Sequence, residues 1–155
     1  MLNSDNKGNP GELKDKIEQL KAKCRAAGLK ITPQRIAVYK TLIGSKTHPS
    51  ADTVFHKVKG VIPNISLDTV NRTLLTLAKI GAISVVEGSG DAKRFDGNLE
   101  NHQHFRCIKC KRIIDFYCKQ FSNITVPQSI RKKFTVLRKT VYLEGVCDLC
   151  KEKNK

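Results

Sequence analysis

Two pairs of cysteines with the spacing C-x-x-C lie in the last third of this 155-residue chain. They are Cys107 with Cys110 and Cys147 with Cys150. Each spacing favours a tight turn in which both sulfurs point the same way, and four thiolates are the ligand set of a closed, tetrahedral Zn²⁺ site. A redox dithiol is the alternative, but it needs only one pair and a βαβ context that this sequence does not predict. We therefore expect a structural zinc ion that joins the start of a small C-terminal unit to its end.

Two histidines and two aspartates around the first cysteine pair form a second candidate metal site. On a strand, His102 and His104 project to the same face because alternate residues do. Asp96, just upstream, and Asp115, on the expected neighbouring strand, supply oxygen ligands. Nitrogen and oxygen ligands together suit Fe²⁺ or Mn²⁺, and also Zn²⁺. Two histidines that merely face solvent are the alternative that involves no metal.

An enzyme is the alternative from another functional class. His102, His104 and Asp96 have the residue types that hold the catalytic ion of a zinc hydrolase. No general base and no pocket-forming loop is evident in the sequence, so we expect a protein that is not an enzyme. A structural zinc module that only binds partners is a further alternative.

Of the remaining thiols, we expect Cys24 to be a core residue, because it continues an apolar helical stripe, and Cys118 to be a bystander.

The second candidate site must be positioned by a small C-terminal unit, for which we expect residues 97–155. Strand-like runs cover residues 104–108 and 113–116, with the first cysteine pair at the bend between them. We predict a helix over residues 122–133 and a strand over 136–143, where apolar and basic residues partly alternate. Such a unit is too small for a self-sufficient core, so a structural metal and dimerisation are both expected.

The N-terminal part, residues 1–96, has the element order of a winged helix-turn-helix. Helix starts are indicated by Thr32, which precedes a proline, and by Ser50 and Ser66, since hydroxyl side chains favour N-cap positions. Runs at residues 82–87 and 92–96 flank the Gly-rich turn at 88–91 and predict a hairpin, which would be the wing. The predicted fold class is therefore α+β, with a winged helix-turn-helix followed by a small α/β dimerisation domain that holds zinc.

One face of the helix that begins after Ser66 has the composition of a DNA-reading surface. Its side chains are short and polar, with one arginine and one acid, where an ordinary solvated face mixes more Glu and Lys. Arginine can pair bidentately with guanine in a major groove. A plain surface helix is the alternative, but the winged-helix order favours DNA. The residues of this face are Thr69, Asn71, Arg72, Thr73 and Thr76.

The charge of the chain also favours a polyanionic partner. Its 29 basic and 14 acidic residues give a formal net charge of +15, which attracts nucleic acid, although an anionic lipid surface or a merely basic protein would also fit. No apolar run approaches the ~20 residues of a membrane span, and the N-terminus lacks a secretory pattern. We therefore expect no membrane association and a cytoplasmic protein, whose six cysteines are reduced thiols, four of them on a metal, rather than three disulfides.

Residues from about 28 to 150 resemble the ferric uptake regulator family. The motifs that carry the resemblance are Ile31-Thr32-Pro33-Gln34-Arg35, His48-Pro49-Ser50-Ala51, Asp91-Ala92 with Arg94-Phe95-Asp96, His102-x-His104 and the two C-x-x-C pairs. The resemblance implies a homodimeric DNA-binding repressor whose four paired cysteines hold structural Zn²⁺. It also implies that His48 completes a regulatory Fe²⁺ or Mn²⁺ site with Asp96, His102, His104 and Asp115. Such an ion would favour the one arrangement of the two halves that matches a palindromic operator.

Within that family the chain looks most like the peroxide-sensing branch, in which iron-catalysed oxidation of a ligand histidine releases DNA. The histidines at the oxidised positions match His48 and His102, and aspartate at position 115 is typical of this branch. The reading helix departs from it, because Asn71 stands where the family usually has Tyr and Arg72 stands where iron-type members carry Arg. With Arg35 of the first motif, the reading-helix residues are the expected DNA contacts. A regulator of iron, manganese or zinc homeostasis is the alternative with the same fold.

Overall fold

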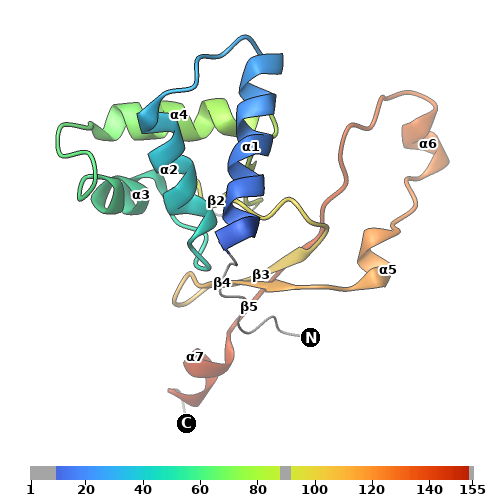
Figure 1. The fold of residues 1–155 in the computed structure, drawn as a ribbon. Coiled ribbons are helices and arrows are strands. Elements are labelled where there is room, and N and C mark those ends of the chain that lie inside the picture. Colours follow the sequence, from blue (N-terminus) through green and yellow to red (C-terminus); the bar gives the residue numbers. More distant parts are fainter. Residues whose placement is uncertain (1–9, 88–91, 154–155) are drawn as a thin grey trace. The chain divides into compact units, whose positions relative to one another are not determined.

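The computed structural model describes residues 10–87 and 92–153, and these fall into two compact units. The N-terminal unit ends at Leu99 and the C-terminal unit begins at Glu100. Figure 1 labels the helices and most of the strands of the two units, which are described separately below. No helix within residues 10–87 and 92–153 has the length and apolar character that crossing a bilayer requires.

Four helices make up most of the N-terminal unit (Figure 1): α1 (Pro10–Ala26), α2 (Pro33–Ile43), α3 (Ala51–Val58) and α4 (Leu67–Lys79). The last three begin at the hydroxyl residues that the sequence indicated. The side chains of Thr32, Ser50 and Ser66 each accept a hydrogen bond from the backbone amide three residues further on. Each such cap satisfies a donor that the first helical turn leaves unpaired, which contributes about 1 kcal/mol.

A single hydrophobic core holds these helices together, with α2, α3 and α4 in mutual contact. Its fully buried members include Leu20, Cys24, Val38, Leu42, Val54, Val58, Val70, Leu74, Leu77 and Phe95. Burial of each such apolar side chain contributes roughly 1.5–3 kcal/mol. The prediction that Cys24 is a core residue is confirmed, since only 1% of its surface is exposed.

Two short strands follow α4 and carry the chain back to the helices. Strands β1 (Ser84–Val85) and β2 (Phe95–Asp96) pair antiparallel, as the predicted hairpin requires, although each is shorter than the predicted run. The predicted turn at 88–91 lies outside the described residues. Phe95 is fully buried in the core, and this anchors Asp96 beside it.

The C-terminal unit is built on a three-stranded sheet of order β4-β3-β5. The central strand β3 (Gln103–Cys107) pairs antiparallel with β4 (Ile113–Phe116) and parallel with β5 (Tyr142–Gly145). Helix α7 (Asp148–Glu152) follows β5 directly. Because β3 and β5 run in the same direction, the turn after β3 and the start of α7 lie at the same end of the sheet.

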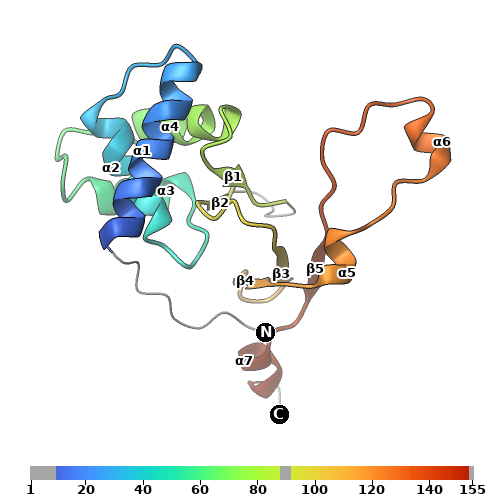
Figure 2. The ribbon, with the colours of Figure 1, turned by 45° about the vertical axis from the view of Figure 1, so that its right-hand side comes forward.

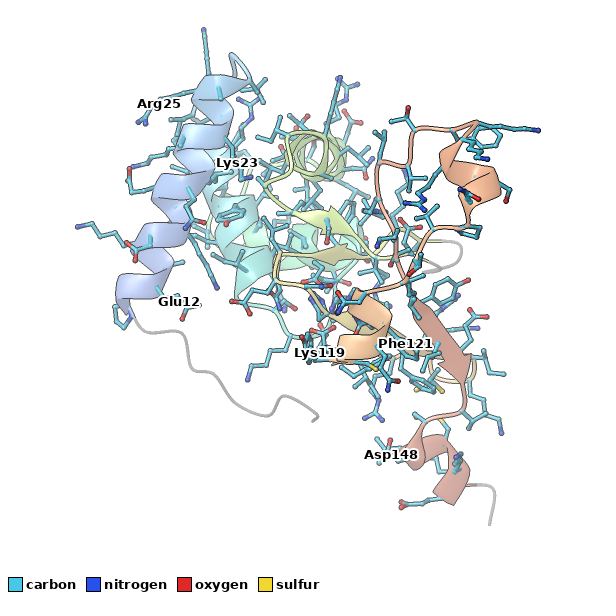
Figure 3. The ribbon with its side chains drawn as sticks, turned by 90° about the vertical axis from the view of Figure 1, so that its right-hand side faces the viewer. Glu12, Lys23, Arg25, Lys119, Phe121 and Asp148 are labelled. Atoms are coloured by element: carbon cyan, nitrogen blue, oxygen red, sulfur yellow. The ribbon has the colours of Figure 1, made fainter. Side chains whose placement is uncertain are left out.

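A long excursion (residues 117–141) leaves the sheet after β4 and returns as β5 (Figure 2). It contains two short helices, α5 (Lys119–Ser122) and α6 (Gln128–Arg131), and nearly all residues beyond 122 are exposed. In Figure 3, Phe121 is labelled on α5, and its ring packs edge-on against that of Phe116 in β4, with centroids 6.3 Å apart.

The prediction of one helix over residues 122–133 is wrong. The chain leaves the helical conformation between α5 and α6 because Pro127 disfavours that conformation in the residue before it. The three residues before the proline, Ile124, Thr125 and Val126, are β-branched and add to this preference.

The predicted strand over residues 136–143 is correct only at its end. Pairing with β3 begins at Tyr142, and residues 136–141 belong to no strand of the described sheet. A strand needs a neighbour to receive its backbone hydrogen bonds. Only four residues of β3 pair with β5. Residues 136–141 therefore have no neighbouring strand, although their side chains alternate.

Candidate metal centres and nucleic-acid interface

The four paired cysteines lie together at one end of the C-terminal sheet. Cys107 ends β3, Cys110 follows in the turn, and Cys147 and Cys150 lie at the start of α7. All four sulfurs are within 4.8 Å of one another, and the Sγ atoms of Cys110 and Cys147 are 3.7 Å apart. A tetrahedral Zn²⁺ with bonds of about 2.3 Å places its sulfurs roughly 3.8 Å apart. The cysteines therefore fit a closed zinc site, and none of them forms a disulfide.

The thiols of this cluster have unequal acidities. The pKa of Cys107 is lowered to about 6, chiefly by the backbone amide of Cys147, which donates a hydrogen bond to its sulfur over 3.4 Å. Burial raises the pKa of Cys150 to about 12, and neighbouring thiols add to this shift. One thiolate is thus favoured by the fold alone, while a second buried negative charge is opposed. A bound cation would compensate the charge of the remaining thiolates, with release of their protons.

An ion pair supports the cluster from outside. Arg112, just before β4, donates from its Nη2 to Oδ1 of Asp148, the first residue of α7, which Figure 3 labels. The backbone of the same turn is tied to both flanking strands. The amide of Cys107 donates to the carbonyl of Arg112 over 2.9 Å, and the amide of Ile108 donates to that of Gly145 over 2.9 Å. The ends of β3, β4 and β5 are therefore fixed relative to one another around the four sulfurs.

Three nitrogen and oxygen ligands lie together elsewhere in the same unit. His104 in β3 is directly opposite Asp115 in β4, and its Nε2 is 3.3 Å from Oδ1 of that carboxylate. His102 lies one residue before β3, with its Nε2 3.1 Å from Nε2 of His104 and 3.7 Å from Asp115 Oδ1. The side chain of Gln103, between the histidines, is instead buried and holds the start of the excursion by accepting from the amide of Cys118 over 2.7 Å.

The N-terminal unit contains a second, smaller group of ligands. His48 and Asp96 are almost fully buried, at 4% and 6% exposure, and His48 Nε2 lies 3.3 Å from Asp96 Oδ2. The other oxygen of Asp96, Oδ1, accepts from the amide of Asn98 over 2.8 Å, so the carboxylate has a fixed direction. A buried imidazole next to a buried carboxylate is a pair that can hold a divalent cation. Spacing in the sequence could not reveal His48, because it is 48 positions upstream of Asp96 and lies in a loop.

A hollow of about 250 Å³ lies between the start of α2 and the first half of α4. The residues that line it are Thr32, Gln34, Arg35, Asp68, Thr69, Arg72, Thr73 and Thr76. The structure thus groups Arg35 from α2 with four residues of the expected reading face of α4, namely Thr69, Arg72, Thr73 and Thr76. Asn71 does not line the hollow, because one hundred degrees of helical turn per residue directs it elsewhere.

The residues around this hollow differ in how far they reach into solvent. The side chain of Arg72 is 79% exposed and pairs with Asp68, whose Oδ2 lies 2.9 Å from Arg72 Nε. Thr73 also lines the hollow, but only 8% of its surface is exposed. Thr32 and Gln34, which the sequence did not predict as DNA contacts, also line the hollow because the start of α2 lies beside α4. Their position follows from helix packing, for which the sequence carried no local signal.

Comparison with known proteins identifies relatives over nearly the whole chain. A model of the ferric uptake regulator family matches residues 26–144. The peroxide-responsive repressor PerR of Staphylococcus epidermidis is 35% identical over 136 residues, which are 88% of this chain and 91% of that protein. The peroxide-responsive repressor PerR of Staphylococcus aureus is 34% identical over 141 residues, 91% of this chain and 95% of that protein.

A solved structure shows the same fold. The ferric uptake regulator Fur of Helicobacter pylori, described as having three functional metal binding sites, matches with a TM-score of 0.73 and 27% identity. The match covers 90% of this chain and 93% of that one. The predicted fold class, α+β with a winged helix-turn-helix and a small C-terminal domain, is confirmed by this likeness.

Proposed function

The chain belongs to the ferric uptake regulator family, and from that premise we propose that it is a metal-dependent, DNA-binding transcriptional repressor that responds to peroxide. One observation carries the proposal: each unit presents its own cluster of nitrogen and oxygen ligands, separate from the four cysteines. The relatives are named as repressors, which favours a regulator over the zinc hydrolase that the ligands alone allow.

We assign a different ion to each kind of ligand. Structural Zn²⁺ would be held by Cys107, Cys110, Cys147 and Cys150, since soft thiolates select zinc. The regulatory ion, Fe²⁺ or Mn²⁺, would be held jointly by the ligands of both units. These are His48 and Asp96 from the DNA-binding domain, residues 1–96, and His102, His104 and Asp115 from the dimerisation domain, residues 97–155.

Chain connectivity supports a shared ion. Asp96 and His102 are separated by six residue steps, which span roughly 20 Å at most in a fully extended chain. Alone, His48 and Asp96 offer two protein ligands, too few for a stable site of Fe²⁺ or Mn²⁺. Together with the three ligands of the other unit they would make a set of five nitrogen and oxygen donors, which suits such an ion.

The regulatory consequence is a shift in population. An ion that needs ligands from both units binds best when the units adopt one mutual arrangement, and it therefore stabilises that arrangement over all others. If that arrangement places two α4 helices at operator half-sites, DNA affinity and metal affinity raise each other by the same factor. The metal then acts as a co-repressor.

Peroxide would act on the same ligands. Bound Fe²⁺ would supply the electrons for reduction of peroxide next to the imidazoles, where Mn²⁺ is far less reactive. His48 and His102 are the side chains that we expect to be oxidised. Loss of either imidazole as a ligand removes the link between the units and so removes the preference for the DNA-binding arrangement.

A regulator of iron or other divalent-metal homeostasis is the second candidate. The likeness to the Helicobacter pylori ferric uptake regulator and the presence of Arg72 favour it. The ligand set is equally compatible with it, because affinity alone does not select among divalent ions. Aspartate at position 115 and the identity to peroxide-responsive repressors favour the first candidate.

We further propose that the protein is a homodimer that binds a palindromic duplex in the cytoplasm, where thiols stay reduced. The excursion of the C-terminal unit exposes apolar side chains that a second copy could cover, among them Phe134 at 62% and Leu137 at 92% exposure. Two copies related by a twofold axis would present two α4 helices to a two-fold symmetric operator. Arg35, Thr69 and Arg72 around the α2–α4 hollow are the contacts we favour, with Asn71 and Thr73 contributing less.

Replacing one ligand from each unit tests the shared regulatory site. We expect Asp96→Ala and His104→Ala each to abolish Mn²⁺-dependent binding to an operator duplex, measured by fluorescence anisotropy. Zinc content and the dimer, measured by atomic emission and light scattering, should be unchanged. The matched controls are Asp52→Ala and His56→Ala, which remove an exposed carboxylate and an exposed imidazole of the N-terminal unit. If either ligand variant lost zinc instead, the replaced residue would belong to the zinc site. If both kept metal-dependent DNA binding, the proposed regulatory site would be wrong.

A further inference from the structure

The loop that carries His48 has an unusual backbone. His48 has φ +50°, in the left-handed region that residues other than glycine rarely adopt. This conformation turns the buried imidazole so that its Nε2 lies 3.3 Å from Asp96 Oδ2. Something in the surrounding structure must therefore hold the loop in place.

The side chain of Arg94 does so from the neighbouring segment. Its Nε donates to the carbonyl of His48, and its Nη2 donates to the carbonyl of Thr47 over 2.6 Å. Two consecutive carbonyls thus bind one guanidinium. The planar, rigid fork of arginine matches such a pair, whereas the single ammonium of lysine fixes no comparable orientation.

The backbone around Arg94 is fixed in turn. Its carbonyl accepts from the amide of Val86 over 2.9 Å, and it forms an isolated bridge with Ser50. The next amide, that of Phe95, donates to the carbonyl of Pro49 over 3.0 Å, and the Phe95 ring is fully buried. The guanidinium therefore projects from a rigid segment that also contains Asp96.

We propose that Arg94 is a positioning residue for His48 and that it sets the affinity of the N-terminal half of the regulatory site. This inference rests on the proposed function, because it concerns the same metal ligands. The two hydrogen bonds from Arg94 to backbone carbonyls preserve the left-handed conformation of His48 and with it the direction of the His48 ring. Without them the loop would have to be ordered when the ion binds, which lowers affinity.

The first test is the affinity of the regulatory site for Mn²⁺ in protein that retains its zinc. We expect Arg94→Met to weaken Mn²⁺ binding roughly 10–100-fold, the range found for residues that support metal ligands. Arg94→Lys should weaken Mn²⁺ binding nearly as much. Because this variant keeps the positive charge, it provides the test if Arg94→Met fails to fold. Lys93→Met is the matched control, since it removes an exposed positive charge one residue away.

Two further readouts separate positioning from a general structural role. The visible spectrum of Co²⁺ bound at this site reports its ligands, and we expect the spectrum of Arg94→Met to move towards that of His48→Ala. Amide hydrogen exchange of residues 45–50 in metal-free protein should be faster in both Arg94 variants and unchanged in Lys93→Met.

The outcomes are distinct. A lower melting temperature with unchanged Mn²⁺ affinity and an unchanged Co²⁺ spectrum would make Arg94 merely structural and overturn the inference. Binding of no second ion by the unaltered protein would overturn the proposed function instead. In that case the exchange of residues 45–50 alone decides whether Arg94 holds the loop: faster exchange in both variants supports the positioning, and unchanged exchange refutes it.

Discussion

Arg72, a proposed DNA contact, forms an ion pair that a contact with a base could replace. Both side chains of its ion pair with Asp68 are exposed to solvent, Arg72 at 79% and Asp68 at 68%. Exposed pairs of this kind contribute about 0–1 kcal/mol, so a stronger bidentate contact with a base can replace it. The pair keeps the guanidinium above the α2–α4 hollow until that contact forms.

Replacement of Arg72 tests this role. Arg72→Ala should weaken binding to the operator by about 1–3 kcal/mol while binding to an unrelated duplex changes much less, because a base contact carries specificity and a phosphate contact does not. Lys79→Ala, at the end of the same helix, is the control for loss of charge. Anisotropy titrations on both duplexes give the specificity ratio. A ratio that Arg72→Ala leaves unchanged would exclude a base contact.

Gly97 shows a second constraint at the scale of one residue, next to the proposed ligand Asp96. A Cβ at this position would lie 2.7 Å from Ile43 Cγ2, closer than real contacts allow, and a tight 3.1 Å from Ile43 Cα. Gly97→Ala should therefore destabilise the N-terminal unit by about 1–3 kcal/mol, as overpacking does. Thermal unfolding measures this. Gly60→Ala is the control, because a Cβ there would meet its nearest atom at an ordinary 3.4 Å; equal unfolding temperatures for the two variants would contradict the prediction.

At the scale of elements, the four cysteines join parts of the C-terminal unit that share few other contacts. Helix α7 has no buried residue within its five positions, so little besides the sulfurs and the Arg112–Asp148 pair fixes it. A zinc ion at the four sulfurs would hold β3 and α7 together with much more energy than packing supplies there.

Loss of one sulfur tests this connection. Cys107→Ser should reduce zinc from one ion per chain to none, because a hydroxyl is a poor zinc ligand. The C-terminal unit should then lose protection from amide hydrogen exchange, while α2–α4 keep theirs. Cys118→Ser is the matched control, since its thiol lies outside the cluster. Retention of tightly bound zinc by Cys107→Ser would contradict the assignment of these ligands.

The elements that sequence reasoning predicted well are those with a local cause. The hydroxyls of Thr32, Ser50 and Ser66 indicate helix starts because each caps its own helix. Features that depend on partners were missed. The conformation of the residues between α5 and α6 is set by Pro127 and not by helical periodicity. Residues 136–141 lack a neighbouring strand, and the left-handed backbone of His48 depends on an arginine far away in the sequence.

The same distinction applies to the candidate sites. Spacing in the sequence was sufficient for the cysteine cluster, because each pair lies within one turn. His102, His104 and Asp115 follow from strand alternation and pairing. His48 could be included only through the family resemblance, since nothing near it in the sequence marks a buried imidazole beside Asp96.

At the scale of the whole molecule, two compact units that each carry proposed ligands of one ion would form a switch. The net charge of +15 supplies non-specific attraction to DNA, which does not depend on a regulatory metal. Specific binding by a dimer requires both reading helices to fit at once, and this is where an ion shared between the units would act. Metal control should therefore change operator affinity much more than affinity for unrelated DNA.

The most direct test of the proposed peroxide response compares the Fe²⁺ and Mn²⁺ forms on an operator duplex, before and after a small dose of peroxide. Anisotropy follows the DNA, and peptide mass analysis follows the protein. If the protein senses peroxide through these ligands, only the Fe²⁺ form releases DNA and His48 or His102 has then gained an oxygen atom. Release of both forms only by a chelator, with no oxidised histidine, would contradict peroxide sensing and identify a regulator of metal homeostasis.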